Sequence, residues 1–285
     1  MESFGIAGGD KRQLYLARSL REDGYPVYFH GLEALNEEGE FPSLSIEEMG
    51  ERCEVVLLPL PASRDGLELN APFSQKPIVL NDGFANAFRN CLVIGGMVGK
   101  LKASSPLWEQ GRLLDYYQRE ELTLGNAFLT AEGAVALALE HSPGALGGSH
   151  CLVTGFGRIG KALCLALRGM GAQVACCARK PWDLTAIRAL GYEALEYSHV
   201  NGQYDVIFNT VPARVVGEEI LSRQGPDTIL IELASAPGGI DRQAVEKCRL
   251  SVVEAPSLPG RFSPKASGEL IKEAVYHILE ERRRP

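Results

Sequence analysis

The feature that most constrains this chain is a glycine-rich turn directly after a short apolar segment. The segment is Cys151–Thr154, and Gly155-Phe156-Gly157-Arg158-Ile159-Gly160 follows it and leads into a helical pattern over residues 161–170. A strand, this glycine spacing and a helix in that order are typical of a Rossmann unit, whose helix N-terminus binds the pyrophosphate of a dinucleotide. We therefore predict that residues 155–160 bind a dinucleotide.

Each glycine of the turn has a separate physical role in this prediction. Gly155 permits the tight turn, Gly157 lets the backbone approach the pyrophosphate, and Gly160 lets the helix pack closely against the strand. The alternative is a glycine-rich turn without a ligand. The strand before the motif and the helix after it favour the binding site.

The tip of the next strand indicates which dinucleotide is bound. Proteins that bind NAD commonly carry an Asp or Glu there, about 20 residues after the motif, which hydrogen-bonds the ribose 2′-hydroxyl. Here the tip reads Cys176-Cys177-Ala178-Arg179-Lys180, with two cations and no acid. An arginine fork can bind a 2′-phosphate, whereas a carboxylate would repel it. We predict NADP(H) rather than NAD(H), held by Ala178, Arg179 and Lys180; the alternative is that both cations begin a solvated loop.

The rest of the chain alternates short apolar runs with helical patterns, which is typical of parallel sheets covered by helices. A length of 285 residues exceeds one average domain. We predict an α/β fold with two open parallel-sheet domains joined by long helices, in which the second domain is the Rossmann dinucleotide-binding domain. Residues 1–125 are expected to form an N-terminal α/β domain for substrate or partner. Residues 126–285 are expected to form the linking helix, the NADP-binding domain and a C-terminal helix that can return to the first domain.

Strands are expected where the apolar runs end in turn residues. In the first domain these are residues 4–7, 26–29, 55–58, 77–80 and 91–94, and in the second 151–154, 173–178, 206–209, 228–232 and 250–254. Residues 108–141 have a helical pattern, and the apolar stretch 130–139 is typical of a helix buried between layers.

Composition and charge argue against several other functions. A net charge of −7 disfavours nucleic-acid binding, which needs clustered cations. The seven cysteines are scattered without a CxxC pair or a Cys/His cluster, so we predict neither a metal site nor disulfides. We find no apolar run near the ~20 residues of a membrane helix and no secretory signal at the start. We therefore expect a cytoplasmic protein with no membrane partner.

Ligands of open α/β sheets lie beyond the carboxyl ends of the strands, so the loops after the strands should face the ligands. In the second domain the loop Asn209-Thr210-Val211-Pro212 is expected to contact the cofactor. Two further loops of that domain, 234–239 and 255–260, follow the last strands. The corresponding loops of the first domain are 8–12, 59–63 and 95–97.

Several motifs along the chain occur together in one known family. They are Gly8-Gly9-Asp10 with Arg12-Gln13, Thr130-x-Glu132-Gly133, Gly155 to Gly160, Asn209-Thr210-Val211-Pro212, Leu233-Ala234-Ser235-x-Pro237-Gly238-Gly239, and Leu258-Pro259-Gly260 with Pro264-Lys265-x-x-Gly268. With these motifs the chain resembles the A-subunit family of dipicolinate synthase over its whole length. One departure is Arg261, which stands where the family pattern has an aliphatic residue.

The resemblance implies an enzyme that oxidises dihydrodipicolinate, or its hydrated precursor, to dipicolinate with NADP+ as the hydride acceptor. It also implies a partner, the flavoprotein B subunit, and action in the mother cell of a sporulating bacterium. The oligomeric state stays open, and a homo-oligomer is compatible with the sequence. Two other functions also stay open: another two-domain NADP-dependent dehydrogenase of a small amino or oxo acid, and a noncatalytic NADP(H)-binding regulatory subunit.

A small dicarboxylate substrate calls for cations or free backbone N–H groups near the strand ends. The candidate substrate-binding residues are Gly9, Arg12, Ser63, Ser235, Gly238, Gly239 and Lys265. Among them, the side chain of Ser235 is expected to hydrogen-bond either the nicotinamide or the substrate, as is that of Thr210.

Oxidation of a dihydropyridine also needs a proton acceptor. Asp10 and Glu132 are the candidates, because both are carboxylates expected near the ligand-binding loops, where burial would raise the pKa toward neutrality. The alternatives are structural. Asp10 can cap the helix that begins near Arg12, and Glu132 can be a partner between the two domains.

Overall fold

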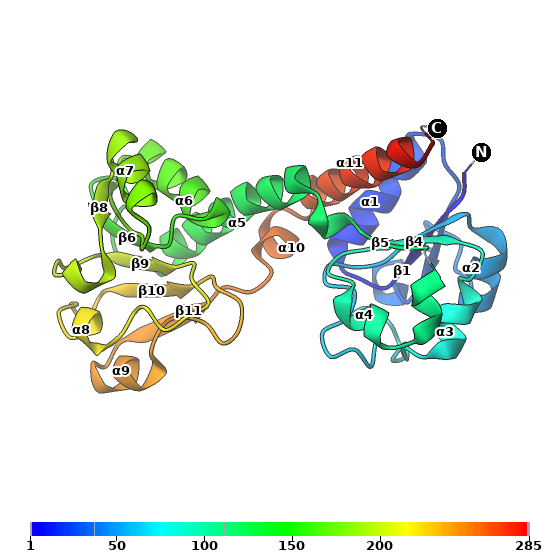
Figure 1. Ribbon diagram of the computed structural model, residues 1–285, viewed down its shortest axis with the longest axis horizontal. Coiled ribbons are helices and arrows are strands. Elements are labelled where there is room, and N and C mark those ends of the chain that lie inside the picture. Colours follow the sequence, from blue (N-terminus) through cyan, green and yellow to red (C-terminus); the bar gives the residue numbers. More distant parts are fainter. Residues whose placement is uncertain (1, 37, 111, 284–285) are drawn as a thin grey trace. The chain divides into compact units, whose positions relative to one another are not determined.

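The computed structural model describes residues 2–36, 38–110 and 112–283 (Figure 1). The chain divides into two compact units, Met1–Asn126 with Ser263–Pro285, and Ala127–Phe262. The domains expected from the sequence were 1–125 and 126–285, with a C-terminal helix that can return to the first domain, and the structure counts the residues after Phe262 to the first unit. Each unit holds one parallel sheet, and the expected fold class of two open parallel-sheet domains is confirmed.

The sheet of the first unit has five parallel strands in the order β2-β1-β3-β4-β5. The strands are β1 (Phe4–Ala7), β2 (Val27–His30), β3 (Val55–Leu57), β4 (Leu92–Gly95) and β5 (Leu113–Asp115). In register, Phe4 lies beside Val27 on one side and Val55 on the other. The strand order reverses between β1 and β3, and ligands of such sheets bind beyond the carboxyl ends at this point.

Helices cover both faces of this sheet. On one face lie α1 (Lys11–Glu22) and α11 (Pro264–Arg283), and on the other α2 (Ile46–Arg52), α3 (Asp82–Ala87) and α4 (Gly99–Ala103). Three single-turn helices complete the unit: η1 (Glu33–Leu35), η2 (Pro106–Gln110) and η3 (Tyr116–Gln118). Figure 1 shows α11 beside α1, where a Cβ on Gly268 would lie 2.7 Å from the carbonyl oxygen of Arg12. This close approach requires glycine at position 268.

The sheet of the second unit has six parallel strands in the order β11-β10-β9-β6-β7-β8. The strands are β6 (His150–Thr154), β7 (Gln173–Cys177), β8 (Glu193–Leu195), β9 (Val206–Asn209), β10 (Ile229–Glu232) and β11 (Ser251–Glu254). Its helical elements are α6 (Arg158–Gly169), α7 (Pro181–Ala189), η4 (Tyr197–His199), α8 (Glu218–Leu221), α9 (Arg242–Lys247) and α10 (Leu258–Phe262). The order reverses between β6 and β9, as in a Rossmann domain, with α6 and α7 on one face and α8 and α9 on the other.

Helix α5 (Glu120–His141) contains the boundary between the units and has 22 residues. By length and composition alone it could cross a membrane, so the expectation that no apolar segment approaches this length is wrong for residues 120–141. Half of its most apolar window is buried inside the structure, as in the core helices of many proteins. This one helix is therefore weak evidence for a membrane.

Three sheet segments differ from the sequence expectation. Residues 77–80 are not a strand of the sheet: Val79 forms only an isolated antiparallel bridge with Glu68, and Leu69 donates its N–H to the carbonyl of Ile78 at 2.9 Å. Strands β5 and β8 were not expected. Each has three residues, largely half-buried or exposed, and so gives too short and too weak an apolar signal.

Residues 38–44 cover the outer edge of the first sheet, along strand β2. Phe29 of β2 donates its N–H to the carbonyl of Pro42 at 2.9 Å and accepts from the N–H of Leu44 at 2.8 Å. The ring of Phe41 stacks on that of Phe29 with centroids 4.4 Å apart. Because the unpaired N–H and C=O groups of an edge strand can pair with other chains, this segment covers an edge that could otherwise form such pairs.

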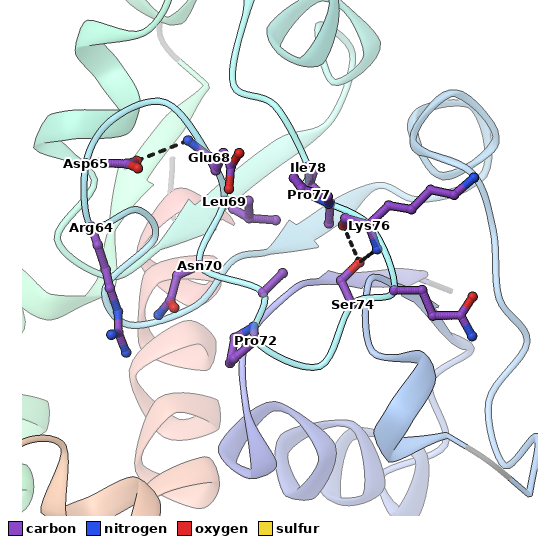
Figure 2. A pocket seen from close by; sticks show the side chains of 12 residues that line it. Arg64, Asp65, Glu68, Leu69, Asn70, Pro72, Ser74, Lys76, Pro77 and Ile78 are labelled. Carbon is purple, nitrogen blue, oxygen red and sulfur yellow. Dashed lines mark hydrogen bonds between the residues drawn. The ribbon is translucent and has the colours of Figure 1, made fainter.

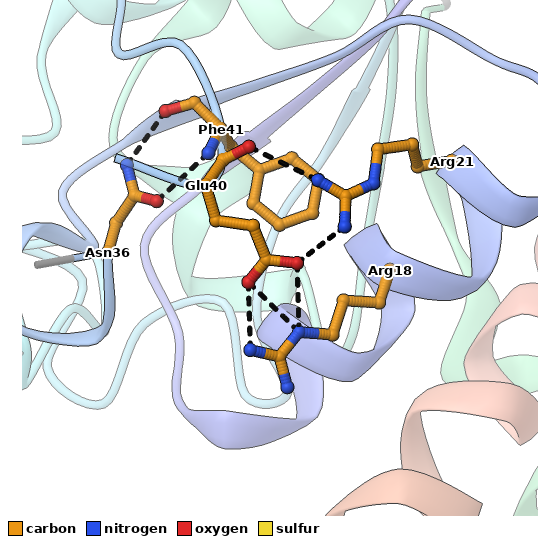
Figure 3. A network of polar contacts seen from close by, with 5 residues as sticks. All are labelled: Arg18, Arg21, Asn36, Glu40 and Phe41. Carbon is orange, nitrogen blue, oxygen red and sulfur yellow. Dashed lines mark hydrogen bonds and ion pairs between the residues drawn. The ribbon is translucent and has the colours of Figure 1, made fainter. Parts of the chain in front are cut away.

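Glu40 holds this segment to helix α1 through two arginines (Figure 3). Its carboxylate accepts hydrogen bonds from Arg18 Nη2 at 2.8 Å and from Arg21 Nη2 at 2.6 Å. The Arg21 guanidinium also lies 4.5 Å from the ring centroid of Phe41. The hydrogen bonds from Arg18 hold the pKa of Glu40 below its ordinary value.

We expect Glu40→Gln to lower the free energy of unfolding by about 1 kcal/mol at neutral pH, because both partly exposed ion pairs are lost. A carboxylate with a lowered pKa stabilises the folded state above its ordinary pKa and loses this contribution as the pH falls. The difference between wild type and variant should therefore shrink between pH 7 and about pH 3. Urea denaturation measures it, with the exposed Glu51→Gln as control. A difference that does not change with pH would contradict this account of the ion pairs.

Candidate functional site

The glycine turn of the second unit joins β6 to α6. Gly155 has a positive φ of +93°, and a Cβ there would lie 2.7 Å from Thr210 Oγ1. A Cβ on Gly160 would overlap the carbonyl oxygen of Gly155. Both glycines are therefore required by the fold of the turn, whether or not a ligand is bound.

Gly157 differs from the other two glycines because a Cβ there would meet no atom within 4 Å. It is the N-cap of α6, and no side chain caps this helix. The N–H groups of the first turn are the natural partners of an anion, and the open space in front of Gly157 gives a pyrophosphate room to approach them. The turn thus fits the phosphate part of a dinucleotide.

The remaining residues of the predicted phosphate turn contribute in different ways. Phe156 is buried in the core on the α6 face of the sheet, so only its backbone can face a ligand. Arg158 is exposed and Ile159 half-buried at the start of α6.

The tip of strand β7 carries the predicted 2′-phosphate residues. Ala178 is buried, whereas Arg179 and Lys180 are exposed. Within residues 2–36, 38–110 and 112–283, neither cationic side chain makes a hydrogen bond or an ion pair, and Lys180 Nζ lies 5.3 Å from the ring centroid of Trp182. Two cations without carboxylate partners at this tip can accept a phosphate.

A buried polar network connects the carboxyl ends of three neighbouring strands. Thr154 ends β6, Asn209 ends β9 and Glu232 ends β10. Thr154 Oγ1 donates to Asn209 Oδ1 at 2.6 Å, and Asn209 Nδ2 donates to Glu232 Oε1 at 2.6 Å. The network therefore crosses the reversal point of the sheet.

Glu232 is 3% exposed and accepts hydrogen bonds with both carboxylate oxygens. Oε1 accepts from Asn209 Nδ2 and from the N–H of Ala234 at 3.1 Å. Oε2 accepts from the N–H groups of Gly239 at 2.8 Å and Ile240 at 3.0 Å. This single side chain fixes the whole loop that follows β10.

The network changes the roles of several predicted ligand residues. Asn209 also donates to the carbonyl of Val211 and accepts from its N–H, which fills the hydrogen-bonding capacity of the side chain. Thr210 Oγ1 donates to the carbonyl of Thr154 at 2.7 Å. Both side chains hold the loop in place, while Val211 and Pro212 are half-buried and exposed on it.

The expectation that the Gly238-Gly239 turn offers free N–H groups to a substrate carboxylate is wrong. The N–H of Gly239 donates to Glu232, and that of Gly238 donates to the carbonyl of Ser235 at 2.9 Å. The turn therefore shapes the loop and has no N–H group to spare. Ser235 itself is exposed.

In the first unit, a partly buried ion pair connects the loops on either side of the strand reversal. Arg12 is 5% exposed, and its Nη2 donates to Asp10 Oδ2 at 2.9 Å and to the carbonyl of Leu60 at 2.6 Å. Asp10 follows β1 and Leu60 follows β3. Arg12 is thus occupied within the protein, and it fixes the carboxyl edge of the sheet.

Asp10 caps helix α1 in a capping box with Gln13. Burial acts to raise its pKa, but the hydrogen bonds and charge of Arg12 outweigh burial, so that the pKa lies below the ordinary value. The expectation that burial brings Asp10 toward neutrality is therefore wrong. The structural alternative, a helix cap, describes this residue.

Gly9 and Ser63 also hold loops of the first unit. The N–H of Gly9 donates to the carbonyl of Asn70 at 2.8 Å. Ser63 Oγ is buried, donates to the carbonyl of Glu68 at 2.6 Å and accepts from the N–H of Gly66 at 2.9 Å. Neither group is free for a substrate in this arrangement.

A pocket of about 380 Å³ lies in the loop between β3 and α3 (Figure 2). Its lining residues include Arg64, Asp65, Glu68, Asn70, Ser74 and Lys76. Asp65 accepts from the N–H of Glu68, and Ser74 donates to the carbonyl of Lys76, so these acids and hydroxyls stabilise the loop itself. In the part of the chain that the structure describes, the exposed Arg64 side chain makes no hydrogen bond.

The other two predicted residues, Glu132 and Lys265, are exposed, so the burial expected for Glu132 is not found. Glu132 lies on the part of α5 that belongs to the second unit. At its neighbour Gly133, a Cβ would lie 2.8 Å from Leu258 Cβ. Lys265 lies in the first turn of α11, in the first unit. No group of three or more His, Cys, Asp or Glu side chains that could hold a metal is found among the residues described.

Sequence reasoning missed Thr154 and Glu232, and did not single out Arg64. Glu232 has a recognisable signal, an acid at the end of the apolar run Ile229–Ile231. A carboxylate that ends a buried strand needs hydrogen-bond partners, and here the N–H groups of the loop supply them. Arg64 gave no periodic signal because it lies in an irregular loop.

Comparisons with known proteins cover nearly the whole chain. The model of the N-terminal domain of the dipicolinate synthase A subunit matches residues 3–103. The model of the D-isomer specific 2-hydroxyacid dehydrogenase NAD binding domain matches residues 111–248. The dipicolinate synthase A subunit of Bacillus subtilis (strain 168) is 27% identical over 284 residues, which cover 98% of this chain and 96% of the relative.

Two solved structures extend the likeness to three dimensions. The dipicolinate synthase A subunit from Bacillus halodurans has a TM-score of 0.83 and 26% identity, with 100% of this chain and 98% of that chain covered. The chain is similar over its whole length to A subunits of dipicolinate synthase. The structure of the corresponding dipicolinate synthase protein from Bacillus subtilis also has a TM-score of 0.83 and 26% identity, with 98% and 96% covered. The family resemblance drawn from the motifs is thus confirmed.

The match to the NAD binding domain defines the function at a coarse level. The chain is an oxidoreductase of the dehydrogenase type, with a Rossmann domain for a nicotinamide dinucleotide. The phosphate turn, the cationic β7 tip and the buried network all lie at the carboxyl edge of that domain.

Substitution by alanine should separate the two kinds of glycine in the turn. Gly160→Ala forces a Cβ into the Gly155 carbonyl and should lower the free energy of unfolding by about 1–3 kcal/mol. Gly157→Ala has an allowed φ of −79° and open space, so unfolding should change by less than about 0.5 kcal/mol. The same Gly157 variant should weaken dinucleotide binding at least about tenfold, a loss of about 1.4 kcal/mol. Denaturation and calorimetric titration measure both; unchanged binding by Gly157→Ala would argue against a ligand at this turn.

Proposed function

We propose that this chain is the NADP-dependent dehydrogenase component of dipicolinate synthase. It oxidises dihydrodipicolinate, or its hydrated precursor, to dipicolinate, together with a flavoprotein B subunit, in the cytoplasm of the mother cell during spore formation. The observation that carries the proposal is a nucleotide turn with a cationic, acid-free β7 tip, in a chain related over 98% of its length to a dipicolinate synthase A subunit.

The preference for NADP+ rests on Arg179 and Lys180. A bidentate guanidinium matches the geometry of a phosphate, and an exposed arginine without an ion-pair partner can turn toward it at little energetic cost. A carboxylate at this tip would instead select the ribose hydroxyl of NAD. Asp183, at the first turn of α7, is the acid next along the chain, and it lies beyond the tip.

Arg179→Ala should weaken NADP+ binding by about tenfold or more, because one charge-assisted interaction is typically worth about 1.5–3 kcal/mol. Binding of NAD+, which has no 2′-phosphate, should change by less than about threefold. Arg188→Ala, an exposed arginine near the end of α7, is the matched control. Calorimetric titration with each dinucleotide measures the effect. If the wild-type protein binds NADP+ and NAD+ equally, the proposed preference is refuted.

When bound, the dinucleotide supplies the hydride acceptor of the reaction. The dihydropyridine loses a hydride and a proton and becomes aromatic, which provides much of the driving force. The protein must therefore mainly position the substrate and accept the proton. Arg64 and Lys265 are exposed cations that can bind substrate carboxylates, and Ser235 is an exposed hydroxyl.

Glu132 remains as the candidate proton acceptor. Asp10 is held ionised by Arg12 and its pKa is lowered, which makes it a weak base. Glu132 is exposed on α5 and keeps both oxygens available for a proton within the described structure. We therefore assign Asp10 and Arg12 to positioning of the loops and Glu132 to proton transfer.

The activity test supplies NADP+ and freshly generated dihydrodipicolinate to the purified chain, alone and with the flavoprotein. We expect NADPH and dipicolinate to form together, followed by absorbance. Glu132→Gln should lower kcat about 100-fold, the usual contribution of a general base, without changing the Kd for NADP+. Glu140→Gln, exposed on the same helix, is the control.

Other results of this assay would select another function. Turnover with a small amino or oxo acid but not with dihydrodipicolinate would favour the second dehydrogenase function, which the match to the 2-hydroxyacid dehydrogenase domain suggests. Dinucleotide binding without turnover, both without and with the flavoprotein, would indicate a noncatalytic regulatory subunit. Full turnover by Glu132→Gln would remove this residue from the mechanism.

A further inference from the structure

We propose that the buried carboxylate of Glu232 sets the redox preference of the dinucleotide site, so that the oxidised cofactor binds more tightly than the reduced one. The inference rests on the proposed dinucleotide binding. It requires neither a particular substrate nor a preference between NADP and NAD. It concerns a charged side chain that the fold buries and that the reaction steps above do not use.

The hydrogen bonds of Glu232 show that it carries a negative charge. Four N–H groups point at its two oxygens, one from Asn209 and three from the backbone of Ala234, Gly239 and Ile240. A proton on either oxygen would add a fifth donor where four N–H groups already donate, and it would displace one of them. The arrangement is therefore built for a carboxylate, which accepts hydrogen bonds and donates none.

This negative charge is not neutralised by a neighbouring cation. Across the described ranges, no Lys, Arg or His side chain forms an ion pair with Glu232, and only dipoles surround the carboxylate. The side chain is 3% exposed, so water and salt screen its field less than that of a surface acid. Its field therefore extends into the adjoining ligand site.

The topology puts this charge on the nicotinamide side of the sheet. In a Rossmann domain the adenosine lies over the half that carries the strand tip for the ribose hydroxyl or phosphate, here β6, β7 and β8. The other nucleotide then lies over β9, β10 and β11. Glu232 ends β10 and also holds Asn209 at the end of β9, so it lies under this second half.

The charge of the nicotinamide ring changes during the reaction. The oxidised ring is positively charged, and it becomes neutral when it accepts a hydride. A fixed anion nearby stabilises the positive form and has no such effect on the neutral form. For an enzyme that oxidises its substrate, this favours loading of the oxidised cofactor and release of the reduced one.

The first measurement compares oxidised and reduced cofactor on the wild-type chain by calorimetric titration. We expect the Kd for NADPH to exceed that for NADP+ by about 3- to 10-fold, the size expected for one charge at intermediate distance and dielectric constant. The same comparison with NAD+ and NADH applies if NAD proves to be the cofactor. Equal affinity, or tighter binding of the reduced form, overturns this inference alone. Failure of every dinucleotide to bind overturns the proposed function as well.

Three variants distinguish the charge from the architecture of the loop. Glu232→Gln removes the charge and should bring the ratio of the two Kd values close to one. Glu232→Asp keeps the charge and should keep the ratio, even if both Kd values rise. Thr154→Val breaks the neighbouring hydrogen bond to Asn209 without a change of charge, so both forms should weaken equally.

The loop and not the charge would set the preference if the ratio of the two Kd values stayed high in Glu232→Gln. The same conclusion would follow if the ratio fell as much in Thr154→Val as in Glu232→Gln. Circular dichroism verifies that each variant is folded. If Glu232→Gln does not fold, the wild-type ratio and the Glu232→Asp ratio still decide: loss of the preference in the charge-preserving variant contradicts the proposal.

Discussion

The carboxyl edge of the nucleotide-binding sheet depends on one buried acid. Glu232 brings together the N–H groups of a loop that would otherwise have no regular partners, and through Asn209 it also fixes the loop of the neighbouring strand. Gly155 and Gly160 then allow the phosphate turn to pack against Thr210 on that second loop. The glycine motif and the acid are thus parts of one arrangement, because the position of the turn depends on the loop that it contacts.

In the first unit, a cation in place of an anion connects the loops at the carboxyl ends of the strands. Arg12 connects the loops after β1 and β3, as Glu232 connects those after β9 and β10. In both units a charged side chain that looks from the sequence like a ligand-binding or surface residue is used inside the protein. The residues that we propose for ligands are ones whose side chains are exposed at the ends of the strands, above all Arg179, Lys180, Arg64 and Ser235.

The sequence was sufficient where local chemistry decides the structure. The strand, glycine turn and helix at residues 150–169 could be predicted because each glycine has a steric reason that is local or nearly so. Strands β5 and β8 could not, because three partly exposed residues carry little apolar signal. The contact of Arg12 with the carbonyl of Leu60 joins residues 48 apart, and that of Glu232 with Asn209 joins residues 23 apart, so spacing along the chain does not reveal them. For this reason the motif predicts the glycine turn, whereas the sequence does not predict the contacts of these polar residues.

Helix α11 belongs to the first unit although the whole second unit precedes it along the chain. Domains usually complete their folding in the order in which the ribosome makes them. Here the face of the first sheet that receives α11, with Leu16 and Leu20 of α1, stays open until residues 264–283 have left the exit tunnel. The second unit, continuous over residues 127–262, has all of its strands by then. Synthesis therefore delivers a complete nucleotide-binding unit while the first unit is still an unfinished, apolar intermediate that chaperones can recognise.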